Sequence, residues 1–147
     1  MEITVLVENH PDGVLKSPWG LSLYIETPRL KMLFDAGPDP EALENNAKLL
    51  RVDLSKIDLV VISHEHGDHV AGLRYLAEAK GGLKVYVPSH MSQSCKDWIR
   101  SLGFNLVEVS RTTKISDGVA IVGELYGPPY EQALAINVEN FGLIVVV

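Results

Sequence analysis

The sequence predicts an α/β fold in which helices cover a mixed sheet. An apolar run at residues 59–62 is typical of a buried strand, and apolar side chains recur at helical spacing over residues 70–77 directly after it. Asp39, Pro40 and Glu41 together form a helix start, with a capping side chain, a proline at the first position and an acid in the first turn. A strand that passes directly into a helix predicts an α/β sandwich.

The other elements follow in order along the chain. We expect strands at residues 3–7, 21–27, 30–34, 84–87, 106–109, 119–126, 133–138 and 143–147. The helix from residue 40 should bury Leu43, Ala47 and Leu50, a second helix should cover residues 70–80, and a third should bury an apolar stripe over residues 91–102. Residues 21–27 alternate apolar and polar side chains, which predicts a strand with one buried face.

Length and composition indicate one globular domain over residues 1–147. The apolar fraction is 46%, the charged fraction is 22%, and the net charge of −6 comes without a basic stripe, so nucleic acid is not the default partner. A small-molecule substrate is expected instead. Cys95 is the only cysteine, which fits a reducing cytoplasm, and no apolar run approaches the length of a membrane span.

Residues 63–69 read S-H-E-H-G-D-H and form the strongest candidate site. Imidazole nitrogen and carboxylate oxygen suit zinc and related transition metals. His64 and His66 lie two residues apart, so an extended backbone directs both rings to the same side, where they can bind one metal ion. Asp68 and His69 lie beyond Gly67, which permits a sharp turn, and can bind a second ion. Taken alone, Asp68 could instead be a helix cap.

The spacing His64-x-His66-x-Asp68-His69 after an apolar strand resembles the metallo-β-lactamase-fold hydrolases. The resemblance extends to residues 33–37, Asn9 and residues 20–26, and these flanks are most similar to the subgroup containing dihydropterin–ribofuranosylaminobenzene phosphate synthase. It implies an αββα sandwich with mixed sheets and two bound divalent ions, zinc in the first place and manganese or iron as alternatives. It also implies that Asp35 steadies the metal-binding loop. In a hydrolase of this kind, Asp68 is our candidate for the group that accepts a proton during the reaction.

Asn9 and His10 leave the end of the first expected strand and are candidates for the substrate side of the site, although a solvated loop is the ordinary place for such a histidine. His90 also follows a strand and could line the pocket, although a helix-start residue is its expected role. Cys95 belongs to the apolar stripe of a helix and has no local activating partner, so we do not expect it to act as a nucleophile.

The chain departs from the family pattern at its end. The sequence stops at Val147 within an apolar strand, and no histidine follows His90. The family supplies further histidines and a bridging aspartate from later segments, so we expect the C-terminal part of the fold to be missing. An uncovered apolar sheet face should follow, which a second copy of the chain could cover as a homo-oligomer.

Three functions remain open from the sequence. The first is a metal-dependent hydrolase that uses a metal-activated water, with an incomplete site in this chain. The second is a non-catalytic metal-binding or assembly module, because only two ligands per ion are present. The third is a pterin-related synthase, as the resembled subgroup implies.

Overall fold

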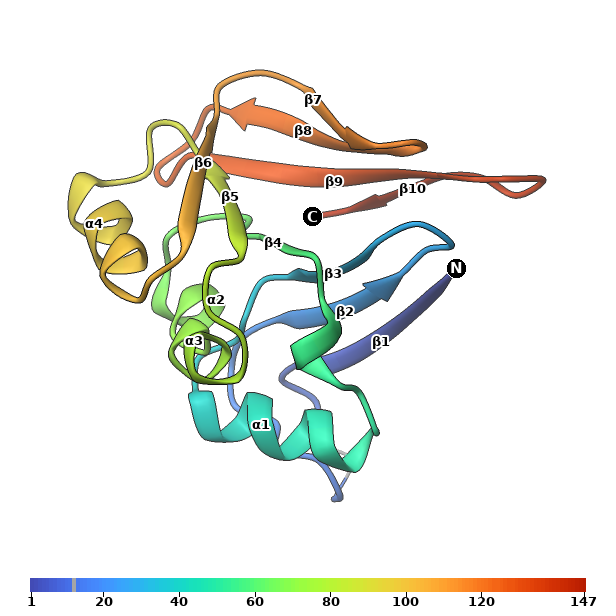
Figure 1. The fold of residues 1–147 in the computed structure, drawn as a ribbon, viewed down its shortest axis with the longest axis vertical. Coiled ribbons are helices and arrows are strands. Elements are labelled where there is room, and N and C mark those ends of the chain that lie inside the picture. Colours follow the sequence, from blue (N-terminus) through green and yellow to red (C-terminus); the bar gives the residue numbers. More distant parts are fainter. Residues whose placement is uncertain (12) are drawn as a thin grey trace.

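Two sheets and one layer of helices form the molecule, as a computed structural model that describes residues 1–11 and 13–147 shows (Figure 1). The larger sheet has the strand order β1 (Glu2–Val7), β2 (Ser22–Glu26), β3 (Lys31–Phe34), β4 (Leu59–Val61), β5 (Lys84–Pro88) and β6 (Asn105–Val109). Strands β1 to β3 pair antiparallel, whereas β3 to β6 are parallel. The predicted mixed sheet is confirmed.

The smaller sheet is entirely antiparallel. Its order is β10 (Gly142–Val146), β9 (Glu131–Val138), β8 (Val119–Leu125) and β7 (Thr113–Ser116). Strand β7 was not predicted, because residues 113–116 read Thr-Lys-Ile-Ser and contain a single apolar side chain. β7 forms because it pairs with β8, and the sequence of residues 113–116 alone does not indicate this pairing.

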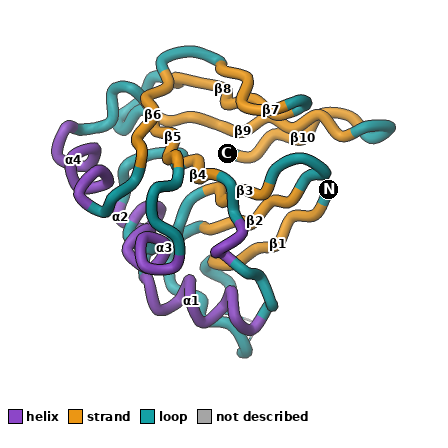
Figure 2. The backbone as a smooth tube through the Cα atoms, in the orientation of Figure 1, coloured by secondary structure: helices purple, strands orange, loops and turns teal. Residues whose placement is uncertain are grey.

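Helices lie on one face of the larger sheet and the smaller sheet lies on the other (Figure 2). The helical layer consists of α1 (Pro40–Leu49), α2 (Gly67–Val70), α3 (Leu73–Ala79) and α4 (Gln93–Ser101), with a 3₁₀ turn at Leu54–Lys56. None of the helices in residues 1–11 and 13–147 is long and apolar enough to cross a membrane.

Alternation along the central strands produces two separate cores. Leu33 and Val60 pack in the core beneath the helices, whereas Phe34 and Val61 pack in the core between the two sheets. Successive side chains of a strand point to opposite faces, so a strand buried on both faces needs a continuous apolar run. The run at residues 59–62 is this strand, as the sequence predicted.

Several local predictions need correction. Residues 21–27 do not form a half-exposed strand, because Ser22 and Tyr24 on the expected polar face are buried. Ser22 donates to the carbonyl oxygen of Asp35 at 2.9 Å, which satisfies its hydroxyl. Leu50 lies beyond the end of α1 and is 37% exposed, so it does not belong to the buried face.

The expected helix at residues 70–80 is interrupted. It forms as α2 and α3 with Gly72 between them, and the Gly72 N–H donates to the carbonyl oxygen of Gly37 at 3.0 Å. A Cβ atom at Gly72 would lie 1.9 Å from the carbonyl oxygen of Ala36. The break therefore allows the chain to approach the end of β3 closely.

Gln132 of β9 joins the two sheets where β4 ends. Its side-chain amide donates to the carbonyl oxygens of Ile62 at 2.8 Å and Tyr86 at 3.0 Å. Its backbone N–H donates to the carbonyl oxygen of Ser63 at 2.9 Å. Gln132 is 2% exposed, so these bonds form in the interior, where they are strong. They hold the start of the predicted metal-binding loop against the second sheet.

The last strand of the smaller sheet, β10, exposes apolar side chains on the outer face of that sheet. Leu143, Val145 and Val147 alternate along the end of the chain and are 66%, 53% and 83% exposed. No helix in the described residues covers this face (Figure 1). That a second copy covers it stays a prediction.

Candidate metal centre

The loop from β4 to α2 brings together all four residues predicted as metal ligands. Nε2 of His64 lies 3.1 Å from Nδ1 of His66, and Nε2 of His69 lies 3.4 Å from Oδ2 of Asp68. The ring centroids of His64 and His69 are 4.1 Å apart. The donors thus form two adjacent pairs, His64 with His66 and Asp68 with His69.

The donor spacing fits divalent metal ions, two protein donors to each ion. Two nitrogens that each lie at 2.0–2.1 Å from a tetrahedral zinc ion are separated by about 3.3 Å. The two observed separations, 3.1 and 3.4 Å, match this value closely. Within the described residues, no group of three or more His, Cys, Asp or Glu side chains is placed to hold one ion. A catalytic zinc usually has three protein ligands, so each pair is one donor short.

Asp35, at the end of β3, is fully buried directly behind this loop. Its Oδ1 accepts from the backbone N–H of Ser63 at 2.6 Å, and its Oδ2 lies 2.7 Å from Nδ1 of His69. A proton on Nδ1 of His69 therefore points at Asp35, and Nε2 of the same ring faces Asp68. A carboxylate that fixes the orientation and tautomer of a histidine in this way is the usual partner of a metal ligand.

Ser63 extends the same arrangement to His64. The Ser63 hydroxyl donates to Oδ2 of Asp35 at 2.6 Å and lies 2.9 Å from Nδ1 of His64. Because its proton is given to Asp35, the hydroxyl oxygen accepts from Nδ1–H of His64, and Nε2 of His64 is left to face His66. The role of Ser63 was not predicted from the sequence. The sequence feature that could have indicated its role is the position of this serine, between an apolar strand and the candidate ligand His64.

The surroundings of His64 and His69 shift the pKa values of the two side chains in opposite directions. Burial lowers the pKa of His64, and the neighbouring His69 lowers it further, so His64 is neutral at pH 7. Burial also opposes charge on His69, but the hydrogen bond and the charge of Asp35 outweigh it and raise the pKa of His69. A neutral imidazole is the form that binds metal.

Backbone contacts hold the loop against its neighbours. The Ala36 N–H donates to the carbonyl oxygen of His69 at 2.7 Å, and the Leu21 N–H donates to that of Asp68 at 3.3 Å. Gly67 has no positive φ and begins α2, and a Cβ there would meet nothing within 4 Å. Gly67 therefore does not adopt the left-handed conformation that favours glycine, and the chain changes direction where helix α2 begins.

The predicted substrate-side residues, Asn9 and His10, lie in the loop after β1. Asn9 and His10 are exposed, and Nδ1 of His10 lies 2.7 Å from Oε2 of Glu8. His90, expected mainly as a helix-start residue, instead lines a groove together with Glu65 and His66. Pocket lining was the alternative role expected for His90, and the parallel pairing of β4 with β5 places the two strand ends at the same edge of the sheet.

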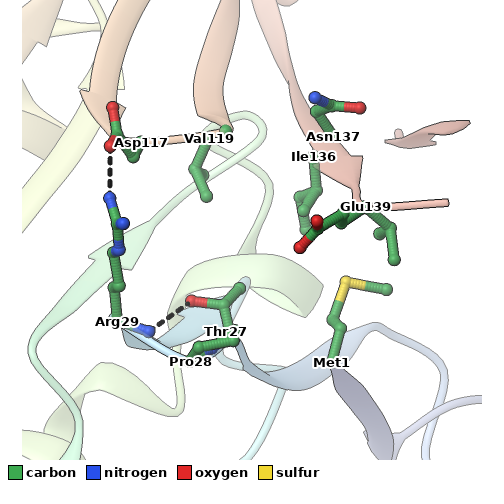
Figure 3. A pocket seen from close by; sticks show the side chains of 11 residues that line it. Met1, Thr27, Pro28, Arg29, Asp117, Val119, Ile136, Asn137 and Glu139 are labelled. Carbon is green, nitrogen blue, oxygen red and sulfur yellow. Dashed lines mark hydrogen bonds and ion pairs between the residues drawn. The ribbon is translucent and has the colours of Figure 1, made fainter.

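Another cavity, of about 460 Å³, lies at the far end of the sheets (Figure 3). Arg29 in the turn between β2 and β3 pairs with Asp117 in the turn before β8, on one side of this cavity. β3 runs from this turn to Asp35, so the cavity and the histidine loop lie at opposite ends of the strand. None of the predicted ligands lines it.

Comparisons with known proteins identify the family to which this chain belongs. The family model described as the β-lactamase superfamily domain matches residues 31–125, which include the whole histidine loop. Ribonuclease Z of Lactobacillus delbrueckii subsp. bulgaricus is 28% identical over 116 residues, which cover 75% of this chain and 37% of that protein. Exodeoxyribonuclease YycJ of Bacillus anthracis is 37% identical over 67 residues, 46% of this chain and 25% of that protein. The chain thus matches only 25–37% of the length of these relatives.

Solved structures show the same fold. The metallo-β-lactamase fold protein YhfI of Bacillus subtilis superposes with a TM-score of 0.71 at 17% identity, over 97% of this chain and 60% of that chain. A quorum-quenching N-acyl homoserine lactone lactonase superposes with a TM-score of 0.63 at 18% identity, over 84% of this chain and 58% of its own. These comparisons establish the superfamily and not the pterin-synthase subgroup. The solved structures show that the chain has the metallo-β-lactamase fold. The family model, which matches residues 31–125, shows that the chain belongs to the β-lactamase superfamily.

Proposed function

We propose that this chain is a metal-dependent hydrolase, or the metal-binding part of one. The observation that carries the proposal is the pair of donor contacts, His64 with His66 and Asp68 with His69, at the end of a buried strand. Relatives named as ribonuclease Z and exodeoxyribonuclease, and a structural neighbour named as a lactonase, are hydrolytic enzymes and support the same class.

Each residue has a distinct part in this proposal. Divalent metal ions, when bound, polarise a substrate oxygen and lower the pKa of a bound water to about 7. His64 and His66 would provide nitrogen donors to one position, and His69 and Asp68 would provide donors to the second. Asp35 and Ser63 hold Nδ1 of His69 and of His64, so that Nε2 of each ring would face a bound ion.

Asp68 is our proposed proton acceptor. Its side chain is 28% exposed, whereas Asp35 is fully buried and already engaged by Ser63 and His69. Asp68 is therefore the carboxylate of the site that solvent and substrate can reach. A positioned carboxylate of this kind contributes roughly 10²–10⁴-fold to a hydrolytic rate.

A non-catalytic metal-binding module is the second candidate. It is favoured by one observation, the lack of a third donor for either pair within the described residues. Such sites should bind metal weakly and exchange it readily.

Metal uptake and turnover measured on the same samples separate the two candidates. The chain and its His66→Ala and His10→Ala variants are titrated with zinc by calorimetry and assayed on a generic phosphodiester and a lactone. Hydrolysis that needs added metal and is lost in His66→Ala, but not in His10→Ala, supports the enzyme. Zinc uptake without hydrolysis supports the module, and no zinc uptake contradicts both.

The metal we propose is zinc, because imidazole and carboxylate donors at tetrahedral spacing suit it. X-ray fluorescence of the purified protein tests this. A dominant zinc signal is expected, and a dominant iron or manganese signal would contradict it.

A further inference from the structure

A groove of about 440 Å³ runs beside the candidate metal centre, between the histidine loop and the connection from β8 to β9. Glu65 and His66 line one side, and Tyr126, Tyr130 and the two prolines between them line the other, with His90 also contributing. We propose that this groove binds a small molecule with a planar, uncharged ring and presents it to the metal-binding loop. The proposal deepens the proposed function, since His66 belongs to both the groove and the first donor pair.

Three rings give the groove an aromatic wall. The His90 and Tyr130 rings are stacked, with centroids 4.8 Å apart and an interplanar angle of 24°. Tyr126 meets Tyr130 edge to face at 5.5 Å. Tyr126 is 88% exposed, so most of its ring surface is free to contact a ligand. A planar ring stacks on such a surface by removing apolar area from water and by favourable ring–ring contact.

His90 is held in place from behind. Glu124, whose side chain is 7% exposed, accepts from the His90 backbone N–H at 2.6 Å and pairs with Nδ1 of its ring. Ser89 also donates to Glu124, at 3.2 Å. These bonds use Nδ1, and within the described residues no partner is found for Nε2, so a ligand can hydrogen-bond there. An oriented histidine beside an aromatic wall is a typical recognition element.

The charge of the groove argues against an anionic ligand. Among the residues that the structure describes, no lysine or arginine lines the groove. Glu65 contributes a carboxylate whose Oε2 accepts from the Ser92 N–H at 2.8 Å. The whole chain carries a net charge of −6. Phosphate recognition relies on arginine, lysine or clustered backbone N–H groups, and nucleic-acid binding relies on a basic surface. A small uncharged ring compound therefore suits the groove better than a nucleic acid does.

Its size supports the same ligand class. Small-molecule sites usually have volumes of roughly 300–1,000 Å³, and the groove falls within this range.

Binding of three related probes tests the proposal: adenosine, adenosine 5′-monophosphate and a single-stranded oligoadenylate. All three carry the same uncharged ring and differ in phosphate charge. Calorimetric titrations on the chain as purified, and again after dialysis against EDTA, remove any contribution of phosphate bound to metal. We expect adenosine to bind more tightly than the monophosphate and the oligonucleotide after EDTA treatment.

Matched variants localise the binding. Tyr126→Ala and Tyr130→Leu should weaken adenosine binding about tenfold. Phe141→Ala removes a ring of similar exposure, 77%, outside the groove and should leave binding unchanged. Circular dichroism spectra confirm that each variant is folded.

Two results would overturn the proposal. One is tighter binding of the monophosphate or the oligonucleotide after EDTA treatment, and the other is adenosine binding that is absent or is unaffected by both tyrosine variants. Adenosine binding in a chain that takes up no zinc would support the groove while contradicting the proposed function, so the two can fail separately.

Discussion

Oδ2 of Asp35 lies 2.7 Å from Nδ1 of His69, although the two residues are 34 positions apart in the chain. The carboxylate is fully buried at the end of β3, whereas His69 lies in helix α2 after β4. Parallel pairing of β3 with β4 brings the two strand ends together. A buried carboxylate from one strand thus orients a histidine that follows the next strand.

Replacing Asp35 tests this relationship. Asp35→Asn keeps the shape but offers an amide where His69 and Ser63 need an acceptor, so zinc affinity should fall roughly 10–100-fold. Calorimetric zinc titration measures the effect. Asp58→Asn, a carboxylate at the other end of β4 that accepts from the Lys31 N–H, is the matched control and should leave zinc affinity unchanged. Equal zinc affinity in Asp35→Asn and wild type would refute the orienting role.

Gly72 should be intolerant of a side chain. A Cβ there would lie 1.9 Å from the carbonyl oxygen of Ala36, a backbone atom that cannot move without shifting the end of β3. Gly72→Ala should lower the free energy of unfolding by about 3 kcal/mol or more. Gly67→Ala, five residues earlier, places its Cβ in open space and should cost less than about 1 kcal/mol. Urea denaturation compares the two, and equal losses would contradict the proposed packing.

Cys95 should react slowly while the chain is folded. Burial, with the charge of Glu65 adding to it, raises the pKa of the Cys95 thiol to about 11. At pH 8 only about one thiol in a thousand is then the reactive thiolate. Reaction with a disulfide reagent should accelerate steeply as the pH rises toward the pKa, and should be fast at pH 8 once urea unfolds the chain. Rapid reaction of the folded chain at pH 8 would contradict the assignment.

The ion pair of Lys96 and Glu108 should make stability depend on acid pH. Nζ of Lys96 lies 2.8 Å from Oε2 of Glu108, and this hydrogen bond, with the charges of Lys96 and Arg100, lowers the pKa of Glu108. A lowered folded-state pKa means that the stabilisation is present above the unfolded value of about 4.3 and is lost as the pH falls through the folded value. Because the Glu108 side chain is 40% exposed, the stabilisation should stay near or below about 1 kcal/mol.

Urea denaturation of wild type and Glu108→Gln at neutral and acid pH checks this dependence. The gap in unfolding free energy between the two should narrow as the pH falls below about 4. Glu44→Gln, which removes the surface partner of Lys48, is the control and should show a smaller gap. A gap that widens in acid would show that the sign is wrong.

The sequence predicted most of the fold because strong local signals mark its central elements. The apolar run of β4 and the cap of α1, where Asp39 accepts from the Glu41 N–H at 3.0 Å, both form as expected. What failed depends on tertiary contacts. Ser22 is polar yet buried, because Asp35 offers it an acceptor, and α2 and α3 separate at Gly72 because another segment packs there.

In the candidate site, too, the residues that are close in sequence were predicted, and those that meet only through tertiary contacts were not. Its four predicted ligands are close in sequence, so their spacing alone indicated them. The groove was not predicted, because His90 and Tyr130 stack across 40 positions of chain and carry no common motif. Ser63 was also missed, since a serine reveals its role only when its buried partner, Asp35, is placed.

Zinc stoichiometry tests the central claim most directly. Equilibrium dialysis followed by elemental analysis should find up to two zinc ions for each wild-type chain. His66→Ala and His69→Ala should each lose zinc, whereas His10→Ala should bind as wild type does. Zinc binding that is absent from wild type, or unchanged in both the His66 and His69 variants, would show that the loop after β4 is not a metal centre.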